Sequence, residues 1–261
     1  MKTTERMPTS KPLKRVLSTK YIASLHPELT QGEVFSYQQY NAIETHYCDT
    51  SYVKKHIEKH TKYAQITGDN TTLYAIITSK KAIHALQEID KTILKKFSGV
   101  FCVGKRTATL LEKQGYNVMQ CFQYAHQLVE YLETHHKKNR KNTKNTHFIF
   151  FCGDLRLATI PSFFEENTSL NYREITVYKT TLHPQKFHQS YWGVLVFSPS
   201  AVKALLTNNT HIDWQETHFF CIGKTTAKAI YRHIKNPKIY YPEVPSVANT
   251  VSLVLENANT I

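Results

Sequence analysis

Short apolar runs alternate along the chain with segments whose apolar residues recur at helical spacing. Residues 77–86 (ITSKKAIHAL) and 101–110 (FCVGKRTATL) each pass from an apolar run of strand length through a small polar turn into a helical pattern. Residues 15–20 (RVLSTK) and 148–156 (FIFFCGDLR) follow the same order more loosely. Alternating strands and helices with short turns are typical of parallel sheets covered by helices on both faces. The pattern therefore predicts an α/β protein of the doubly wound class.

Two of these units recur later in the chain. Residues 196–205 (VFSPSAVKAL) repeat residues 77–86 at an offset of 119 positions and share with them a serine, two alanines and the final leucine. Residues 220–229 (FCIGKTTAKA) repeat residues 101–110 at the same offset, with six of the ten positions identical. An equal offset means that the intervening segment was copied without net insertion. We therefore expect two flavodoxin-like parallel-sheet lobes related by internal duplication.

Polar turns follow the predicted strands. In doubly wound sheets, ligands bind at the carboxyl ends of strands, where helix N-termini present unpaired N–H groups and positive dipole ends. Ser198 is placed as an N-cap with Pro199 as the first helical residue, and Ser79 holds the equivalent position. Taken singly, each hydroxyl is explained by capping its own helix, whereas the set across both repeats predicts an anion-binding edge. This set comprises Ser18, Thr19, Lys20, Ser79, Lys80, Thr107, Arg156, Ser198, Ser200, Lys224, Thr225 and Thr226.

Composition narrows the class of protein. The 261 residues are 41% hydrophobic and 20% charged, which is typical of a globular chain long enough for two lobes. Because no apolar run is long enough to span a bilayer and the start of the chain is polar, we expect a cytoplasmic protein. The five cysteines include no CxxC pair. Cys102, Cys152 and Cys221 lie in apolar strand-like runs, which favours buried thiols over zinc ligands.

The formal net charge of +13 raises nucleic acid, anionic lipid and acidic small molecules as partners. Much of this charge is concentrated in two segments. Residues 135–145 (HHKKNRKNTKN) form a polar block, interpreted as a solvated loop, and the chain up to Arg15 is also basic. Neither block interleaves aromatic residues with its charges, as single-strand binders do. A nucleic-acid-binding protein, whose affinity falls steeply with salt, is therefore the least favoured alternative.

Familiar catalytic and cofactor motifs are missing. Gly223-Lys224-Thr225 resembles the end of a P-loop, but His218 stands where that loop needs its first glycine. No GxGxxG follows a predicted strand, and no GxSxG is present. His56 and His60 are spaced like metal ligands on one helix face, but without a third ligand a solvated helix explains them better. The sequence thus predicts no metal and no nucleotide cofactor.

Six segments together resemble the uroporphyrinogen-III synthase family, and the resemblance covers nearly the whole chain after Arg15. They are residues 77–86, 103–116 (VGKRTATLLEKQGY), 152–156 (CGDLR), 175–180 (ITVYKT), 196–205 and 222–230 (IGKTTAKAI). The resemblance implies a chain that begins in one lobe, crosses to the other and returns. Residues 1–42 and 182–261 then form the first lobe and residues 43–181 the second, with two crossing strands and a cleft between the lobes.

The resemblance also implies an activity in tetrapyrrole (haem) biosynthesis. Hydroxymethylbilane, which bears eight carboxylates, loses water and closes to uroporphyrinogen III through a spirocyclic intermediate, with inversion of its terminal pyrrole ring. Tyr178, on a β-branched segment typical of strands, is then the expected general acid, because a phenol with a pKa of about 10 is neutral at pH 7. Gly153 and Gly223 join the binding set. We expect a monomeric lyase without cofactor, metal, nucleic-acid or membrane partner; the alternative is a two-lobed protein that binds an anionic small molecule or tetrapyrrole without reacting.

Overall fold

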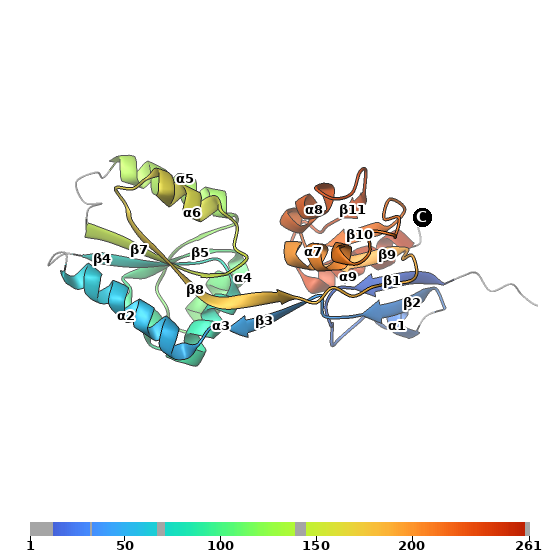
Figure 1. Cartoon of the computed structure of the whole chain (residues 1–261), viewed down its shortest axis with the longest axis horizontal. Helices are drawn as coiled ribbons and strands as arrows, with labels where there is room; N and C mark the ends of the chain where they lie inside the picture. Colours follow the sequence, from blue (N-terminus) through green and yellow to red (C-terminus); the bar gives the residue numbers. More distant parts are fainter. Residues whose placement is uncertain (1–12, 32, 67–70, 139–144, 259–261) are drawn as a thin grey trace, which may run out of the picture. The chain divides into compact units, whose positions relative to one another are not determined.

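The structure, a computed structural model, describes residues 13–31, 33–66, 71–138 and 145–258. The chain divides into two compact units (Figure 1). The described residues of Met1–Glu44 and Thr181–Ile261 form unit 1, and those of Thr45–Thr180 form unit 2. Within the described ranges, no helix has both the length and the apolar character needed to cross a membrane.

Unit 1 is built on a parallel sheet with the order β11-β10-β9-β1-β2. Numbered along this unit, the order is 2-1-3-4-5, that of flavodoxin-like folds. Helices α7 (Pro199–Thr207) and α8 (Lys224–Tyr231) pack on one face, and α1 (Pro27–Gln31) and α9 (Val247–Ala258) pack on the other. The strands are β1 (Lys14–Ser18), β2 (Phe35–Gln39), β9 (Gly193–Val196), β10 (His218–Cys221) and β11 (Lys238–Tyr240).

Unit 2 is built on a sheet with the order β3-β8-β7-β4-β5-β6, in which β8, β7, β4, β5 and β6 run parallel. Strands β3 and β8 carry the chain from unit 1 to unit 2 and back (Figure 1). They are antiparallel, since Cys48 N donates to Val177 O at 3.0 Å and His183 N donates to Ala42 O at 2.9 Å. The strands are β3 (Ile43–Tyr47), β4 (Thr72–Ile77), β5 (Gly99–Val103), β6 (Val118–Phe122), β7 (Thr146–Gly153) and β8 (Asn171–Leu182).

Apart from the additional strand β3 in unit 2, the two sheets have the same strand order. The repeat offset brings β4, β5 and β6 onto β9, β10 and β11, and each trio is consecutive in its sheet. In unit 1, β1 and β2 then take the places that β7 and β8 hold in unit 2. This correspondence is compatible with the internal duplication expected from the sequence, and the α/β class with parallel sheets is confirmed.

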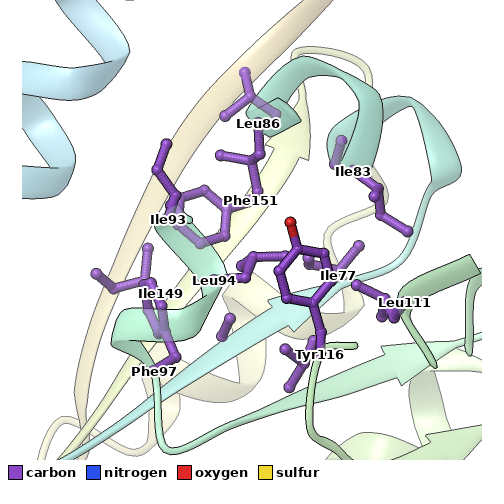
Figure 2. Close-up of a cluster of buried hydrophobic side chains, with 14 of the residues drawn as sticks. Ile77, Ile83, Leu86, Ile93, Leu94, Phe97, Leu111, Tyr116, Ile149 and Phe151 are labelled. Atoms are coloured by element: carbon purple, nitrogen blue, oxygen red, sulfur yellow. The ribbon is translucent and has the colours of Figure 1, made fainter. Parts of the chain in front are cut away.

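Unit 2 has a separate apolar core on each face of its sheet. Helices α2 (Thr50–Ile66), α3 (Lys80–Ile89), α4 (Lys105–Lys113) and the short η1 (Ile93–Lys96) cover one face, and α5 (Ala125–Lys138) and α6 (Thr159–Glu166) cover the other. Figure 2 shows the first core, in which Phe97 meets Phe151 edge to face at 5.7 Å between ring centroids. The Tyr116 hydroxyl, at the rim of this core, donates to Lys91 O at 2.7 Å. A rigid sheet therefore carries the loops at its carboxyl edge.

The polar block at residues 135–145 is partly helical, although its composition predicts a solvated loop. The prediction of a loop is wrong for residues 135–138, which form the end of α5. His135 stacks on Tyr131 at 3.9 Å between ring centroids, and its Nδ1 lies 2.9 Å from Tyr131 O, so local contacts one turn apart extend the helix. Residues 139–144, like residues 1–12 of the basic start, lie outside the described ranges.

The expectation of buried thiols is confirmed. Cys102, Cys152 and Cys221 are at most 1% exposed, on β5, β7 and β10. Burial raises the pKa of each of these thiols to about 12. They are therefore neutral core residues at physiological pH, because burial disfavours the thiolate.

Candidate active site

The polar residues of unit 1 lie after three neighbouring strands, β1, β9 and β10, at the carboxyl edge of the sheet. Behind β1, the Ser18 hydroxyl donates to Lys20 O at 2.6 Å and the Thr19 hydroxyl donates to Leu195 O at 3.0 Å. The first bond closes the turn and the second joins it to β9, while Lys20 is exposed. The expected helix N-terminus is not found here, because α1 begins only at Pro27, so this turn offers side chains rather than a helix dipole.

The loops after β9 and β10 both open helices. Ser198 is the N-cap of α7, where its hydroxyl accepts from Ala201 N at 3.1 Å, and Pro199 follows as the first helical residue. This cap is as predicted from the sequence. Ser200 is partly buried in the same first turn, and Gly223 caps α8, followed by exposed Lys224 and Thr225. The carboxyl edge of unit 1 thus carries two helix N-termini and exposed cations.

In unit 2, the neighbouring strands β7, β4 and β5 end at the equivalent edge. Ser79 is the N-cap of α3 and accepts from Lys81 N at 3.2 Å, as predicted, while Lys80 is exposed. Gly104 caps α4 with a φ of 90°, a conformation that favours glycine, and its N–H donates to Phe122 O at 2.7 Å. This edge therefore also carries two helix N-termini.

Thr107 and Thr226, equivalent positions of the two repeats, lie beneath these edges. They are 5% and 2% exposed, so both side chains pack inside the first turn of α4 or α8. Their backbone N–H groups donate to Gly104 O and Gly223 O and close the two caps. The structure therefore gives both threonines a local role in shaping the loops.

The charge pattern of the four helices α3, α4, α7 and α8 points to an anion. All four lie within the described ranges, and none has an acidic residue in its first turn. Lysine opens three of them instead, at Lys80, Lys105 and Lys224. The helix dipole disfavours cations at an N-terminus and favours anions there, each by about 0.3–1 kcal/mol. The lysines at three of these helix starts are therefore in positions that a bound anion would stabilise.

Arg156 differs from the other cations. It lies in the turn between β7 and α6, three residues before α6 begins at Thr159, so the expected helix N-terminus is again not present at this residue. Its Nη2 forms an ion pair with Glu174 Oε1 at 2.8 Å, and Glu174 also accepts from the Tyr172 hydroxyl at 3.1 Å. The guanidinium is thus held by a carboxylate of the protein, which raises its pKa.

Tyr178 lies on β8 at a bulge opposite the end of β7. The register changes between Cys152 and Gly153, so that Gly153 pairs with Tyr178. The ring packs directly on Gly153, because a Cβ there would lie 2.5 Å from Tyr178 Cζ and 2.8 Å from its hydroxyl oxygen. Partial burial raises the pKa of Tyr178, and a hydrogen bond with the Ser79 side chain opposes this shift. The phenol is therefore neutral at physiological pH and able to donate a proton.

Four residues that contact Tyr178 or the segments beside it were not singled out from the sequence. Lys81 Nζ donates to Thr45 Oγ1 at 2.5 Å and lies 5.6 Å from the centroid of the Tyr178 ring. Asp154 N donates to Tyr178 O at 3.2 Å, and Asp154 Oδ1 accepts from Thr180 N at 2.9 Å. These contacts fix β8 against the loop after β7 and place one ammonium group against the ring.

The two histidines with metal-like spacing have other contacts. Both lie on α2, where His56 Nδ1 is 2.8 Å from Tyr52 O and His60 lines a small cavity of about 30 Å³ with His147 and Arg173. Across the described ranges, no three His, Cys, Asp or Glu side chains are grouped closely enough to hold a metal ion.

Known proteins share this architecture. The family description "Uroporphyrinogen-III synthase HemD" matches residues 54–252, most of the chain. No curated protein sequence matches the chain significantly. Among solved structures, the chain is similar to a mutant uroporphyrinogen III synthase from the extremely thermophilic bacterium Thermus thermophilus, with a TM-score of 0.64 and 13% sequence identity over 95% of this chain and 99% of that chain. The family match over residues 54–252 shows that this chain belongs to the uroporphyrinogen-III synthase family.

Proposed function

We propose that this chain is a uroporphyrinogen-III synthase in which Tyr178 is the general acid. The observation that carries this role is the position of its phenol. It is kept neutral by burial and packed on Gly153 at the carboxyl edge of unit 2. Burial keeps the proton on the phenol and the packing on Gly153 restricts the orientation of the ring, and general acid catalysis requires both.

The substrate is a linear tetrapyrrole carrying carboxylates, and each unit has a polar edge suited to carboxylates. The first turns of α3, α4, α7 and α8 offer N–H donors, and the cations at their starts add charge. Each helix N-terminus contributes about 0.3–1 kcal/mol toward an anion, so each unit, with two such N-termini, favours a ligand with several carboxylates. The accessible residues of the edges are the proposed contacts: Lys20, Lys80, Ser200, Lys224 and Thr225.

The proton of Tyr178 goes to the hydroxyl of the hydroxymethyl group. As the carbon–oxygen bond breaks, water leaves, the adjacent pyrrole becomes an azafulvenium cation and Tyr178 becomes a phenolate. The substituted carbon of the terminal pyrrole attacks, and the resulting spirocyclic intermediate fragments and recloses with that ring inverted. Loss of a proton from the reclosed ring to the phenolate restores Tyr178. No electrons are gained or lost overall, so the reaction needs no redox cofactor.

The binding edges determine which carbon attacks. Free hydroxymethylbilane closes without inversion to the type I isomer, so formation of the type III isomer requires the substrate to be held in a folded conformation. Orientation effects of this kind reach several kcal/mol when the reacting atoms are held in line. We place this activity in a cytoplasmic monomer. The charges of the edges suit a small polyanion, so we propose no nucleic-acid or membrane partner.

Replacement of Tyr178 by phenylalanine tests the assignment. Tyr178→Phe removes the acid and keeps the ring, so kcat for type III formation is expected to fall by about 100-fold or more, while the product stays type III. Tyr116→Phe is the matched control, because it removes a phenol of the same unit that donates only to Lys91 O. Equal kcat values for the two variants would refute the role of Tyr178. A protein that only binds the tetrapyrrole would show no catalysed closure in any variant.

A further inference from the structure

The ammonium group of Lys81 occupies an unusual position. Lys81 is the second residue of α3, where the positive end of the helix dipole disfavours a cation, and it is partly buried, which disfavours its charge as well. Its neighbour Lys80 is exposed, as is usual for a lysine. Lys81 instead donates to Thr45 Oγ1 at 2.5 Å. Two unfavourable effects and a specific partner indicate that the position serves the site.

The same ammonium lies over the Tyr178 ring. Its Nζ is 5.6 Å from the ring centroid, within the roughly 6 Å over which a cation is attracted to an aromatic face. Thr45 and Tyr178 stand on β3 and β8, which are hydrogen-bonded neighbours in the sheet. Lys81 therefore links the start of α3 to both strands and holds one face of the ring.

We propose that Lys81 is a positioning residue for ring closure, which fixes the Tyr178 ring and stabilises the phenolate formed when Tyr178 gives up its proton. This inference rests on the proposed role of Tyr178. A cation attracts a phenolate more strongly than a neutral phenol, so Lys81 stabilises the state after proton transfer more than the state before it. Only such differential stabilisation accelerates the chemical step.

Several groups around the phenol affect how readily it loses its proton. Burial raises the pKa of Tyr178, and the carboxylate of Asp154, which follows β7, raises it further, so both oppose loss of the phenol proton. Asp154 is itself fixed by Thr180 N and cannot turn away without losing that bond. Lys81 supplies the opposite charge on the face of the ring, and the Ser79 side chain lowers the pKa of the phenol.

The test compares Lys81→Met with Lys81→Arg. Methionine keeps most of the length of the side chain without its charge, so kcat for type III formation is expected to fall about tenfold, equivalent to about 1.4 kcal/mol, with KM little changed. Arginine restores the charge and is expected to recover most of the lost kcat. Lys113→Met, an exposed lysine at the far end of α4, is the matched control and is expected to keep wild-type values.

A double variant separates action through Tyr178 from a direct contact with substrate. In the Tyr178→Phe background no phenolate forms, so Lys81→Met is expected to have no further effect on kcat. Thr45→Val, which removes one acceptor of the Lys81 ammonium, is expected to lower kcat by about two- to fivefold, and it provides a second test if Lys81→Met does not fold.

Three outcomes overturn the proposal: a kcat for Lys81→Met equal to that of Lys113→Met, an equal loss of kcat in the Tyr178→Phe background, or an effect confined to KM. The last result would make Lys81 a binder of a substrate carboxylate. If the wild-type protein forms no type III product, the proposed function itself fails. If it does and Lys81→Met behaves as the control, only this inference fails.

Discussion

Gly153→Ala gives a sharp test of how the site is built, because the change is one methyl group. The new Cβ would lie 2.5 Å from Tyr178 Cζ and 2.8 Å from the phenol oxygen. Ordinary carbon–carbon contacts are about 3.5–4.0 Å, so the ring or the end of β7 must move by about 1 Å. The ring has little freedom to move, since Ser79 and Lys81 contact it on the side of α3.

Two effects of different size are expected. Overpacking of this kind costs about 1–3 kcal/mol of the free energy of unfolding, measured by urea denaturation. A displacement of about 1 Å of a catalytic group costs about 100-fold in rate, so kcat for type III formation should fall far more than the loss of stability explains. Folded protein with a strongly reduced kcat is therefore the expected result.

Gly99→Ala is the matched control. Its Cβ would lie 2.6 Å from Met119 Sδ, but Met119 is 47% exposed and its flexible side chain can turn away. We expect this variant to keep wild-type kcat and nearly wild-type stability. The reasoning is refuted if Gly153→Ala also keeps wild-type kcat, or if it lowers kcat by the same factor in the Tyr178→Phe background, where no acid remains to be displaced.

Three further predictions concern charge, capping and thiols. The active form of Tyr178 is the protonated phenol and its pKa is raised, so kcat/KM should hold through neutral pH and fall only above about pH 10; an alkaline loss that persists unchanged in Tyr178→Phe would contradict this. Ser198→Ala should lower the free energy of unfolding by about 1 kcal/mol because Ala201 N loses its partner, whereas Ser198→Gly should cost only a few tenths in the same urea titration. Iodoacetamide should alkylate exposed Cys121 in the folded protein and buried Cys221 only after unfolding, which mass spectrometry of digested protein would show; equal rates would contradict the described burial.

The parts of the fold that sequence predicts well depend on local chemistry. Ser79, Ser198 and Pro199 have the capping positions expected of them, because a cap is formed by residues within one turn of each other. The strand–loop–helix units at residues 77–86, 101–110, 196–205 and 220–229 are confirmed for the same reason, since their apolar spacing is a local signal. The helical end of α5 was missed because the polar last turn of a helix and a polar loop have the same composition.

The contacts around Tyr178 depend instead on pairing between distant segments. The Lys81 contact with Thr45 requires β3 to pair with β8, and the packing of Tyr178 on Gly153 requires a bulge, neither of which has a local signature. The ion pair of Arg156 with Glu174 likewise follows from the neighbouring positions of β7 and β8. The sequence thus indicates which loops form the polar edges, and the structure shows which contacts their side chains make.

The isomer composition of the product tests the central claim most directly. Hydroxymethylbilane generated in situ is closed in the presence of the protein, and the oxidised uroporphyrins are separated by chromatography. The account predicts type III product in an amount that rises with protein concentration, above the type I product of spontaneous closure. If folded protein yields type I alone, the chain does not direct ring inversion and the proposed function is wrong.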